Sequence, residues 1–364
     1  MKRTFFISFL LLLIAGCAEQ EKKVPIEYTD MIGIMAFDYI DEEKKKMTVA
    51  IPQYSQEAEE STKIFSVDTD LVSQGIVKIE RLSDRKIVLN QLRVILVSEE
   101  FAREGQLRNV IEHIYRNAEV GNKALIAIVK GRADDLIHGK YPDKPGINFY
   151  LNDLLLPTVN TAFNPNTNIH DFIYSVTNPV LDPIIPYLEK KDGKIEITGI
   201  ALFKGDSMVQ TIPPEDAIYI QAMQNEQDLS PLYIELPEDA KVLINLVKSK
   251  CIIKGNKDKE QPKLSIHLNI RGTLSEYKST KADKINTWKE ISELEKAINK
   301  QLEKDIKSFI EKLNEQELDP IGLSENFRKH TKGKWTREMT DEVISKLEVE
   351  VEVKTIIVSA GTLK

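Results

Sequence analysis

Apolar and polar residues alternate most clearly in the C-terminal third of the chain. Residues 242–253 and 264–274 are long apolar-rich segments, which predicts two strands joined by the polar loop 255–262. A third strand is predicted over residues 347–357. There, one face would carry Leu347, Val349, Val351 and Val353, and the other Glu348, Glu350, Glu352 and Lys354.

Residues 283–316 have apolar side chains at every third or fourth position, which predicts an amphipathic helix about 50 Å long. We expect its apolar stripe to pack on the sheet of its own domain; a coiled coil with a partner helix is the alternative. The stripe includes Trp288, Leu294, Leu302 and Phe309, and the opposite face, with Glu303, Lys307 and Glu311, is expected to meet solvent.

The N-terminal half alternates between predicted strands and helices, which indicates a mixed α/β domain. Strands are predicted at residues 31–39, 47–54, 92–97 and 124–129, and helices at 66–83, around 107–115 and at 133–138. Ser66 and Asp68 are candidate caps of the first helix. Ser98 closes the third strand and places Glu99 and Glu100 in the first turn of a further helix, where acidic side chains are favoured.

Two further segments separate the halves. Residues 141–186 are rich in Asn and Pro, which is typical of a long surface connection. Residues 195–203 and 208–212 predict a hairpin with Gly205 in its turn, and Pro213 and Pro214 open a helix toward Met223. We read this hairpin and helix as a small middle module.

The first 17 residues predict export and lipidation. Lys2 and Arg3 precede an apolar stretch that is too short to span a bilayer, and Ala15 and Gly16 stand directly before Cys17. This arrangement resembles a bacterial lipobox, in which the cysteine receives a diacylglycerol and becomes the first mature residue. A plain secretory signal is the alternative.

Charge and cysteine content agree with an anchored body. Loss of the signal changes the net charge from −7 to −9, so acyl chains rather than electrostatic attraction would hold the protein at the extracytoplasmic face of the membrane. No basic cluster indicates a nucleic-acid partner. With Cys17 acylated, Cys251 has no disulfide partner within the chain, and its apolar surroundings predict a buried, inert thiol.

We therefore expect a multi-domain α+β protein of about three modules, with mixed and antiparallel sheets and a long helix packed on the C-terminal sheet. The predicted boundaries are a signal peptide at residues 1–16, a lipidated leash at 17–25, an N-terminal α/β domain at 26–190, a middle module at 191–240, and a C-terminal domain of antiparallel sheet plus long helix at 241–364.

No motif for catalysis, metal binding or a cofactor is found. The histidines have no metal-ligand spacing, and sequences of the GxSxG, GxxxxGK[ST] and GxGxxG types are missing; the histidines are His113, His138, His170, His267 and His330. Asp134 and Asp135 are best read as charges at a helix N-terminus rather than as an acid/base pair. The sequence predicts no enzymatic activity.

Six segments in order resemble the Ger(x)C family of spore germination lipoproteins. They are the lipobox at Cys17, residues 30–34 (Asp-Met-Ile-Gly-Ile), residues 98–105 (Ser-Glu-Glu-Phe-Ala-Arg-Glu-Gly), Arg116-Asn117, residues 198–209 (Thr-Gly-Ile-Ala-Leu-Phe-Lys-Gly-Asp-Ser-Met-Val), and residues 319–323 (Asp-Pro-Ile-Gly-Leu) followed by Trp335. The chain departs from the family pattern at Ala18-Glu19, Gln91 and Ser324. For Gly199, Gly322 and Trp335 we expect turn geometry and core packing rather than ligand contact.

The resemblance implies a non-enzymatic, lipid-anchored C subunit of a nutrient germinant receptor, which works with integral-membrane A and B subunits in the spore inner membrane. It implies no cofactor, and we expect the purified body to bind no amino acid or sugar tightly by itself. A solute-binding lipoprotein of an ABC importer is the alternative, although such proteins usually have two repeated α/β lobes. An extracytoplasmic enzyme is a third reading.

Overall fold

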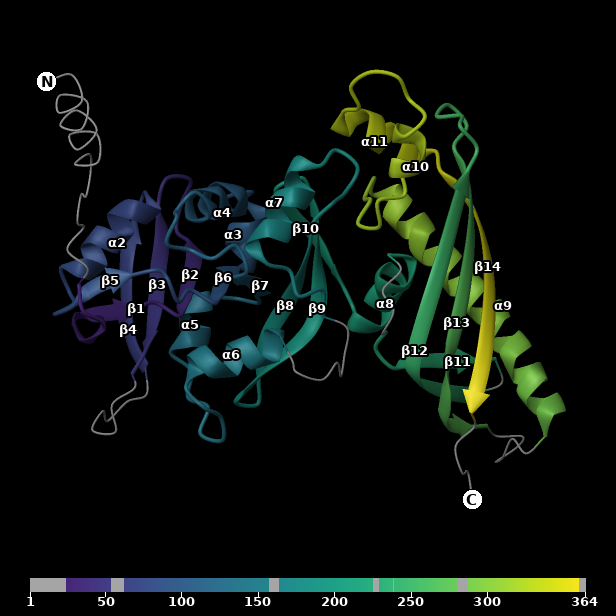
Figure 1. Ribbon diagram of the computed structural model, residues 1–364, viewed down its shortest axis with the longest axis horizontal. Helices are drawn as coiled ribbons and strands as arrows, with labels where there is room; N and C mark the ends of the chain where they lie inside the picture. Colours follow the sequence, from purple (N-terminus) through teal and green to yellow (C-terminus); the bar gives the residue numbers. More distant parts are fainter. Residues whose placement is uncertain are drawn as a thin grey trace, which may run out of the picture.

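Two large sheets lie one after the other along the long axis of the protein (Figure 1), and two further strands form a small sheet of their own. The computed structural model describes residues 24–53, 62–156, 164–224, 229–237, 239–279 and 287–359. The predicted α+β class is confirmed, with several sheets and a long C-terminal helix packed on one of them.

The larger sheet has eight strands in the order β10-β9-β8-β7-β6-β2-β3-β4. Its central strands β2, β6, β7 and β8 are parallel, and the outer pairs are antiparallel. The strands are β2 (Ile34–Tyr39), β3 (Lys45–Pro52), β4 (Thr62–Thr69), β6 (Val94–Ser98), β7 (Leu125–Val129), β8 (Ile184–Lys191), β9 (Lys194–Lys204) and β10 (Ser207–Ile212). β6 and β7 are buried at every residue because helices cover both faces.

The helices divide between the two faces. One core contains residues of α2 (Val72–Glu80), α3 (Glu99–Arg103), α4 (Leu107–Tyr115) and α7 (Ile169–Thr177), and the other those of α5 (Ala133–Ile137) and α6 (Ile147–Leu155). A short 3-10 helix η1 (Ile26–Tyr28) leads into β1 (Thr29–Met31), which pairs in parallel with β5 (Lys86–Val88).

The helix predicted at residues 66–83 is wrong in its first part. Ser66 and Asp68 lie in strand β4, which pairs with β3, and the helix α2 begins only at Val72. Ser66 is therefore no helix cap; its hydroxyl donates to Asp134 at 2.9 Å. Alternation of apolar residues through Ile64, Phe65 and Val67 is irregular, and pairing with β3 decides the conformation.

The surface connection predicted at residues 141–186 is also wrong. This segment contains helices α6 and α7 and the start of β8, and it buries Leu151, Phe172 and Ile185 completely. Asn168 is the N-cap of α7 and accepts a hydrogen bond from the backbone N–H of Asp171 at 3.0 Å. The Asn content thus marks a helix start here rather than a loop.

The expected middle module, residues 191–240, does not form a separate sheet. Its hairpin is present with Gly205 at φ +63°, but β9 and β10 are edge strands of the eight-stranded sheet. Its helix α8 (Pro214–Met223) and strand β11 (Leu232–Leu236) contribute to the C-terminal core. Strand β9 joins the two parts, because Ala201 and Phe203 face the N-terminal core while Ile200 and Leu202 face the C-terminal one.

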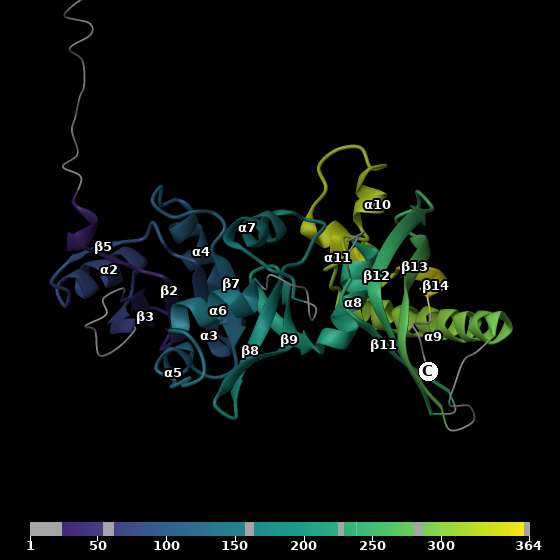
Figure 2. The ribbon, with the colours of Figure 1, turned by 60° about the horizontal axis from the view of Figure 1, so that its bottom comes forward.

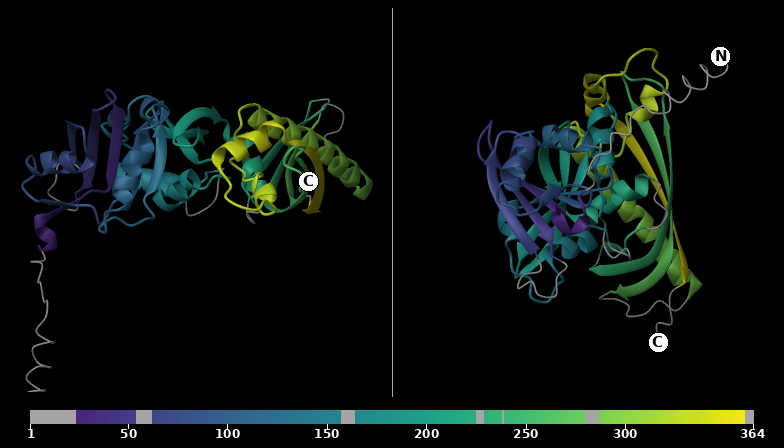
Figure 3. Two further views of the ribbon diagram at one scale, coloured as in Figure 1. Left: turned by 90° about the horizontal axis from the view of Figure 1, so that it is seen from above. Right: turned by 60° about the vertical axis from the view of Figure 1, so that its left-hand side comes forward.

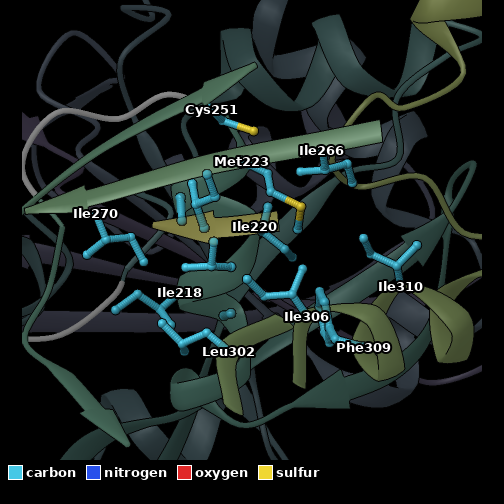
Figure 4. Packing of buried hydrophobic residues seen from close by; sticks show 14 of the residues in the cluster. Ile218, Ile220, Met223, Cys251, Ile266, Ile270, Leu302, Ile306, Phe309 and Ile310 are labelled. Carbon is cyan, nitrogen blue, oxygen red and sulfur yellow. The ribbon is translucent and has the colours of Figure 1, made fainter. Parts of the chain in front are cut away.

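The C-terminal sheet has the order β11-β12-β13-β14 and contains β12 (Ala240–Gly255), β13 (Lys263–Lys278) and β14 (Glu348–Ser359). Figure 4 shows side chains from α8, β12, β13 and the long helix α9 (Trp288–Glu315) pointing toward one another in its core. The sheet is mixed rather than antiparallel, because α9, α10 (Glu325–Arg328) and α11 (Arg337–Ser345) carry the chain back so that β14 runs parallel to β13.

Helix α9 packs on its own sheet as predicted and contacts both edge strands, β11 and β14. Leu294, Leu302 and Phe309 are buried, but Trp288 is 82% exposed at the first turn and does not belong to the stripe. Asp283 and Ile285, at the predicted start, lie outside the described residues. No helix in the described ranges is long and apolar enough to cross a membrane.

Candidate functional site

Cys17, the predicted lipidation site, lies outside the residues that the structure describes. The first described elements, η1 and β1, lie at the end of the molecule farthest from the C-terminal sheet (Figures 2 and 3). The described part of the chain therefore begins at the outer end of the N-terminal domain.

The other candidate residues from the sequence lie in surroundings that fit a role in the fold. Cys251 is buried in β12, and burial raises the pKa of its thiol to about 11, so a reactive thiolate is disfavoured at neutral pH. Asp134 and Asp135 lie in the first turn of α5, as predicted. Across the described ranges, no group of His, Cys, Asp and Glu side chains is arranged to hold a metal ion.

A crevice of about 360 Å³ opens at the carboxyl ends of β2, β6 and β7. It lies where the strand order reverses, between β2 and β6, which is the usual place for ligands in open α/β sheets. Here, however, side chains of the sheet already accept hydrogen bonds from the backbone N–H groups at the N-termini of the neighbouring helices. Asp38 accepts hydrogen bonds from the backbone N–H groups of Ala133 and Asp134 at 2.7 and 3.0 Å, and Ser98 caps α3.

The charges in this crevice are mostly satisfied by neighbours. Burial raises the pKa of Asp38 even though two backbone N–H groups donate to it. Glu99 is partly buried, but hydrogen bonds from Tyr187 and Arg103 hold its pKa below the ordinary value. These contacts tie α3 to β8, and none of the buried side-chain atoms that lack a hydrogen-bond partner in the described residues belongs to the lining of the crevice.

Arg103 also connects α3 to the β9–β10 hairpin. Its guanidinium donates to the backbone carbonyl of Val209 at 3.0 Å. Gly105, at φ +69°, ends this segment so close to the hairpin that a Cβ there would lie 2.8 Å from the hydroxyl of Ser207. Two segments that are about 100 residues apart in the chain, 98–105 and 198–209, are thus in direct contact.

Hydrogen bonds and ion pairs link the two parts of the chain at the interdomain joint, which we define as Asp182, Lys204, Asp319, Arg337 and Thr340 with their partners. Asp182 accepts a hydrogen bond from the backbone N–H of Asp319 at 2.7 Å, and its own N–H donates to the Asp319 carbonyl at 3.0 Å. An Arg337 guanidinium nitrogen lies 2.9 Å from an Asp182 carboxylate oxygen, as an ion pair without hydrogen-bond alignment.

Asp319 organises the loop that resembles the family's late signature. Its carboxylate accepts from the backbone N–H groups of Gly322, Leu323 and Ser324 at 2.7–2.8 Å, and from the Ser324 hydroxyl at 2.6 Å. Complete burial nevertheless raises its pKa to about 6. Gly322 has φ +81°, a conformation that favours glycine.

Trp335 closes the joint from the other side. Its indole N–H donates to the hydroxyl of Thr340 at 2.8 Å, and that hydroxyl donates to the carbonyl of Pro179 at 2.6 Å. Arg337 donates to the carbonyls of Asn178 and Leu181. The structure thus places Gly322 in a turn and Trp335 in packing; a Cβ on Gly199 would lie 3.0 Å from the carbonyl oxygen of Ile212.

Lys204, at the tip of the hairpin, completes the joint by pairing with Glu317 and lying 3.7 Å from Asp341. Three of the segments that resemble the family therefore form one continuous structure, from α3 through the hairpin to the 319–323 loop. The sequence analysis missed Asp182 and Arg337. For Asp182, the available signal was an ionisable residue between Leu181 and Pro183, in an apolar context. These contacts link the N-terminal and C-terminal parts of the chain.

Comparisons with known proteins match both parts of the chain. Residues 22–190 match the family model described as "Spore germination protein N-terminal domain", and residues 198–361 match the one described as "Spore germination B3/ GerAC like, C-terminal". Spore germination protein GerQC of Bacillus cereus is 28% identical over 363 residues, which cover 99% of each chain. Spore germination protein B3 of Bacillus subtilis (strain 168) is 23% identical, over 98% of this chain and 96% of its own.

A solved structure shares the fold. The crystal structure of the GerBC protein aligns with a TM-score of 0.57 over 89% of this chain and 96% of that chain, at 18% identity. Together, the two family models span almost the whole sequence, from residue 22, within the predicted leash, to residue 361, just past the end of β14. The chain therefore belongs to the Ger(x)C family of spore germination proteins.

Proposed function

We propose that this protein is the lipid-anchored, non-enzymatic C subunit of a nutrient germinant receptor, which acts with integral-membrane A and B subunits in the spore inner membrane. The observation that carries the proposal is the combination of full-length family membership with a lipobox that ends at Cys17, just before the folded body. The names of the relatives, all spore germination proteins, support the same process.

The fold supports this function over that of an importer's solute-binding lipoprotein. Such a protein would have two repeated lobes with a cleft between them. The two sheets here differ in strand number and strand order, and the contact between them is filled by the buried residues of the interdomain joint. The structure thus favours a rigid subunit over a two-lobed ligand trap.

The anchor is tested by comparing Cys17→Ala with Cys251→Ala in the full-length protein. Cys17→Ala should leave the membrane fraction and abolish germination through the receptor, because a dominant part of membrane affinity comes from the acyl chains. Cys251→Ala, which removes the other cysteine, should stay with the membrane. Retention of Cys17→Ala in membranes after a high-salt wash without detergent would refute the lipid anchor.

Assembly is tested separately by affinity purification from detergent-solubilised spore membranes. Tagged wild-type protein should recover the A and B subunits. Recovery of the permease of an ABC importer instead, or micromolar binding of a nutrient by the isolated body in calorimetry, would favour the importer function.

A further inference from the structure

Within the part of the chain that the structure describes, helices pack on one face of the C-terminal sheet and none packs on the other. In β13, Leu264, Ile266, Leu268 and Ile270 point to the core that contains α8 and α9, so the intervening residues point outward. In β12, Cys251 points inward, which places Lys248, Lys250 and Ile252 outward. The long strands β12, β13 and β14 that form this face lie side by side in Figure 1.

Four cations gather in the middle of this outward face. Lys248 is directly opposite Arg271, and Asn269 lies between Lys250 on one side and Lys354 on the other. Side chains directly opposite on neighbouring strands have Cβ atoms about 4.5–5.5 Å apart. We call Lys248, Lys250, Arg271 and Lys354 the basic face.

No carboxylate among the described residues forms an ion pair with the basic face. The next positions along the same strands are paired: His267 lies 2.8 Å from Glu352, and Lys263 lies 2.7 Å from Glu348. Like charges directly opposite each other destabilise a sheet, so the Lys248–Arg271 placement costs the isolated protein stability. An external anionic group would remove this cost.

Exposed aliphatic side chains border the basic face. Ile252 is 40% exposed and Ile356 is 37% exposed, and both point outward with the cations; Val358, at the register shift that follows, is 51% exposed. Cations that alternate with single apolar side chains are suited to a partner that contributes both carboxylates and apolar contacts.

We propose that the basic face binds an acidic segment of a partner protein in the receptor. This inference deepens the proposed function, on which it rests for the partner's identity, by assigning the surface of this subunit that makes the contact. Two carboxylates of the partner would lie against Lys248 with Arg271 and against Lys250 with Lys354, between the aliphatic side chains.

A protein partner fits this face better than an anionic membrane does. Glu348, Glu350 and Glu352 point outward along the edge strand β14, beside the cations. A flat anionic bilayer would meet the glutamates together with the lysines, whereas a protein segment can follow the cations alone.

The test compares two double variants of the full-length, lipidated protein. Lys250→Gln with Lys354→Gln removes two cations from the basic face. The control, Lys300→Gln with Lys304→Gln, removes two exposed cations from α9. The readouts are recovery of A and B subunits in affinity purification and the thermal unfolding temperature of the body.

The basic-face variant should lower recovery of the A and B subunits by about tenfold or more, as expected when interface charge pairs are lost, with an unfolding temperature equal to that of wild type or higher. The control should keep wild-type recovery. If wild type recovers both subunits and the basic-face variant recovers them equally well, the inference is overturned while the proposed function stands. If wild type itself recovers neither, the proposed function fails first.

A vesicle-binding assay tests whether an anionic membrane, rather than a protein, binds the basic face. The protein without its lipid should bind phosphatidylcholine vesicles no better when they contain phosphatidylglycerol. Binding to the phosphatidylglycerol vesicles that is lost in the basic-face variant would overturn the protein partner in favour of a membrane surface.

Discussion

Burial and hydrogen bonding act in opposite directions on the carboxyl group of Asp319. Four donors within 2.8 Å stabilise its charged form, whereas complete removal from water stabilises the neutral form and raises the pKa to about 6. Asp182, which lies against it, has its pKa raised by burial as well, in spite of the ion pair with Arg337. Both groups therefore hold protons more tightly in the folded than in the unfolded protein.

This predicts a pH dependence of stability centred on the interdomain joint. Between the ordinary value of 3.8 and about 6, the folded state binds more protons than the unfolded state, so the free energy of unfolding should fall as pH rises through this range. A shift of two units corresponds to about 3 kcal/mol. The free energy of unfolding, measured by denaturant titration at several pH values, should depend less steeply on pH in Asp319→Asn, which has no titratable group at this position. An unchanged slope would show that Asp319 titrates normally.

At the scale of single elements, α9 both fills the core and protects the edge of its sheet. Three side chains of α9, one turn apart, accept hydrogen bonds from backbone N–H groups on the edge of β14 that faces away from β13. Glu303 accepts from Val353 at 3.0 Å, Asn299 from Thr355 at 2.7 Å and Glu295 from Ile357 at 2.8 Å. The expectation that Glu303 only faces solvent is therefore wrong. Covered in this way, the edge of β14 has fewer free donors to pair with another strand.

Replacing Glu295, Asn299 and Glu303 together by Ala should expose this edge and promote self-association. We expect larger species in light scattering at concentrations where wild type is monodisperse, and a loss of about 1 kcal/mol per hydrogen bond in the free energy of unfolding. Replacement of Glu295 and Glu303 by Gln keeps a carbonyl acceptor and serves as the control. An Ala triple variant as monodisperse as the Gln variant would contradict the protective role.

The elements that were predicted correctly are those whose local signal agrees with their surroundings. Ser98 caps α3, Gly205 forms the hairpin turn and the stripe of α9 is core, because each depends on neighbours in the sequence. Strand β4 and helices α6 and α7 were missed, because their conformation depends on partners far along the chain. The interdomain joint was missed for the same reason: Asp182 and Arg337 are distant in sequence and acquire meaning only when the sheets meet.

At the scale of the whole molecule, the N-terminal and C-terminal parts share apolar packing as well as the interdomain joint. Val180, Ile200, Leu202 and Ile212 belong to the core that contains α9 and the C-terminal sheet, although β9 and β10 are strands of the larger sheet. Parts that share a core should unfold together, so we expect calorimetry of the wild-type body to give one cooperative transition.

Arg337→Gln should separate that transition into two. The change leaves Asp182 buried beside Asp319 without its cation, at a cost of about 3–5 kcal/mol that falls on the contact between the domains. Lys329→Gln, at an exposed cation of the same region, is the control and should keep a single transition. One transition with an unchanged midpoint in Arg337→Gln would indicate that the ion pair does not couple the domains.

The pairing of β14 with β13 also determines the order in which the C-terminal domain can assemble during synthesis. Because a chain is made from its N-terminus onward, β13 and α9 leave the ribosome before the strand that fits between them. Until β14 arrives, one long edge of β13 is unpaired and the acceptors on α9 have no donors. The C-terminal domain can therefore be completed only once β14 has been made, and a chain that stops before Glu348 would present the unpaired edge of β13 to any chaperone or protease that meets it.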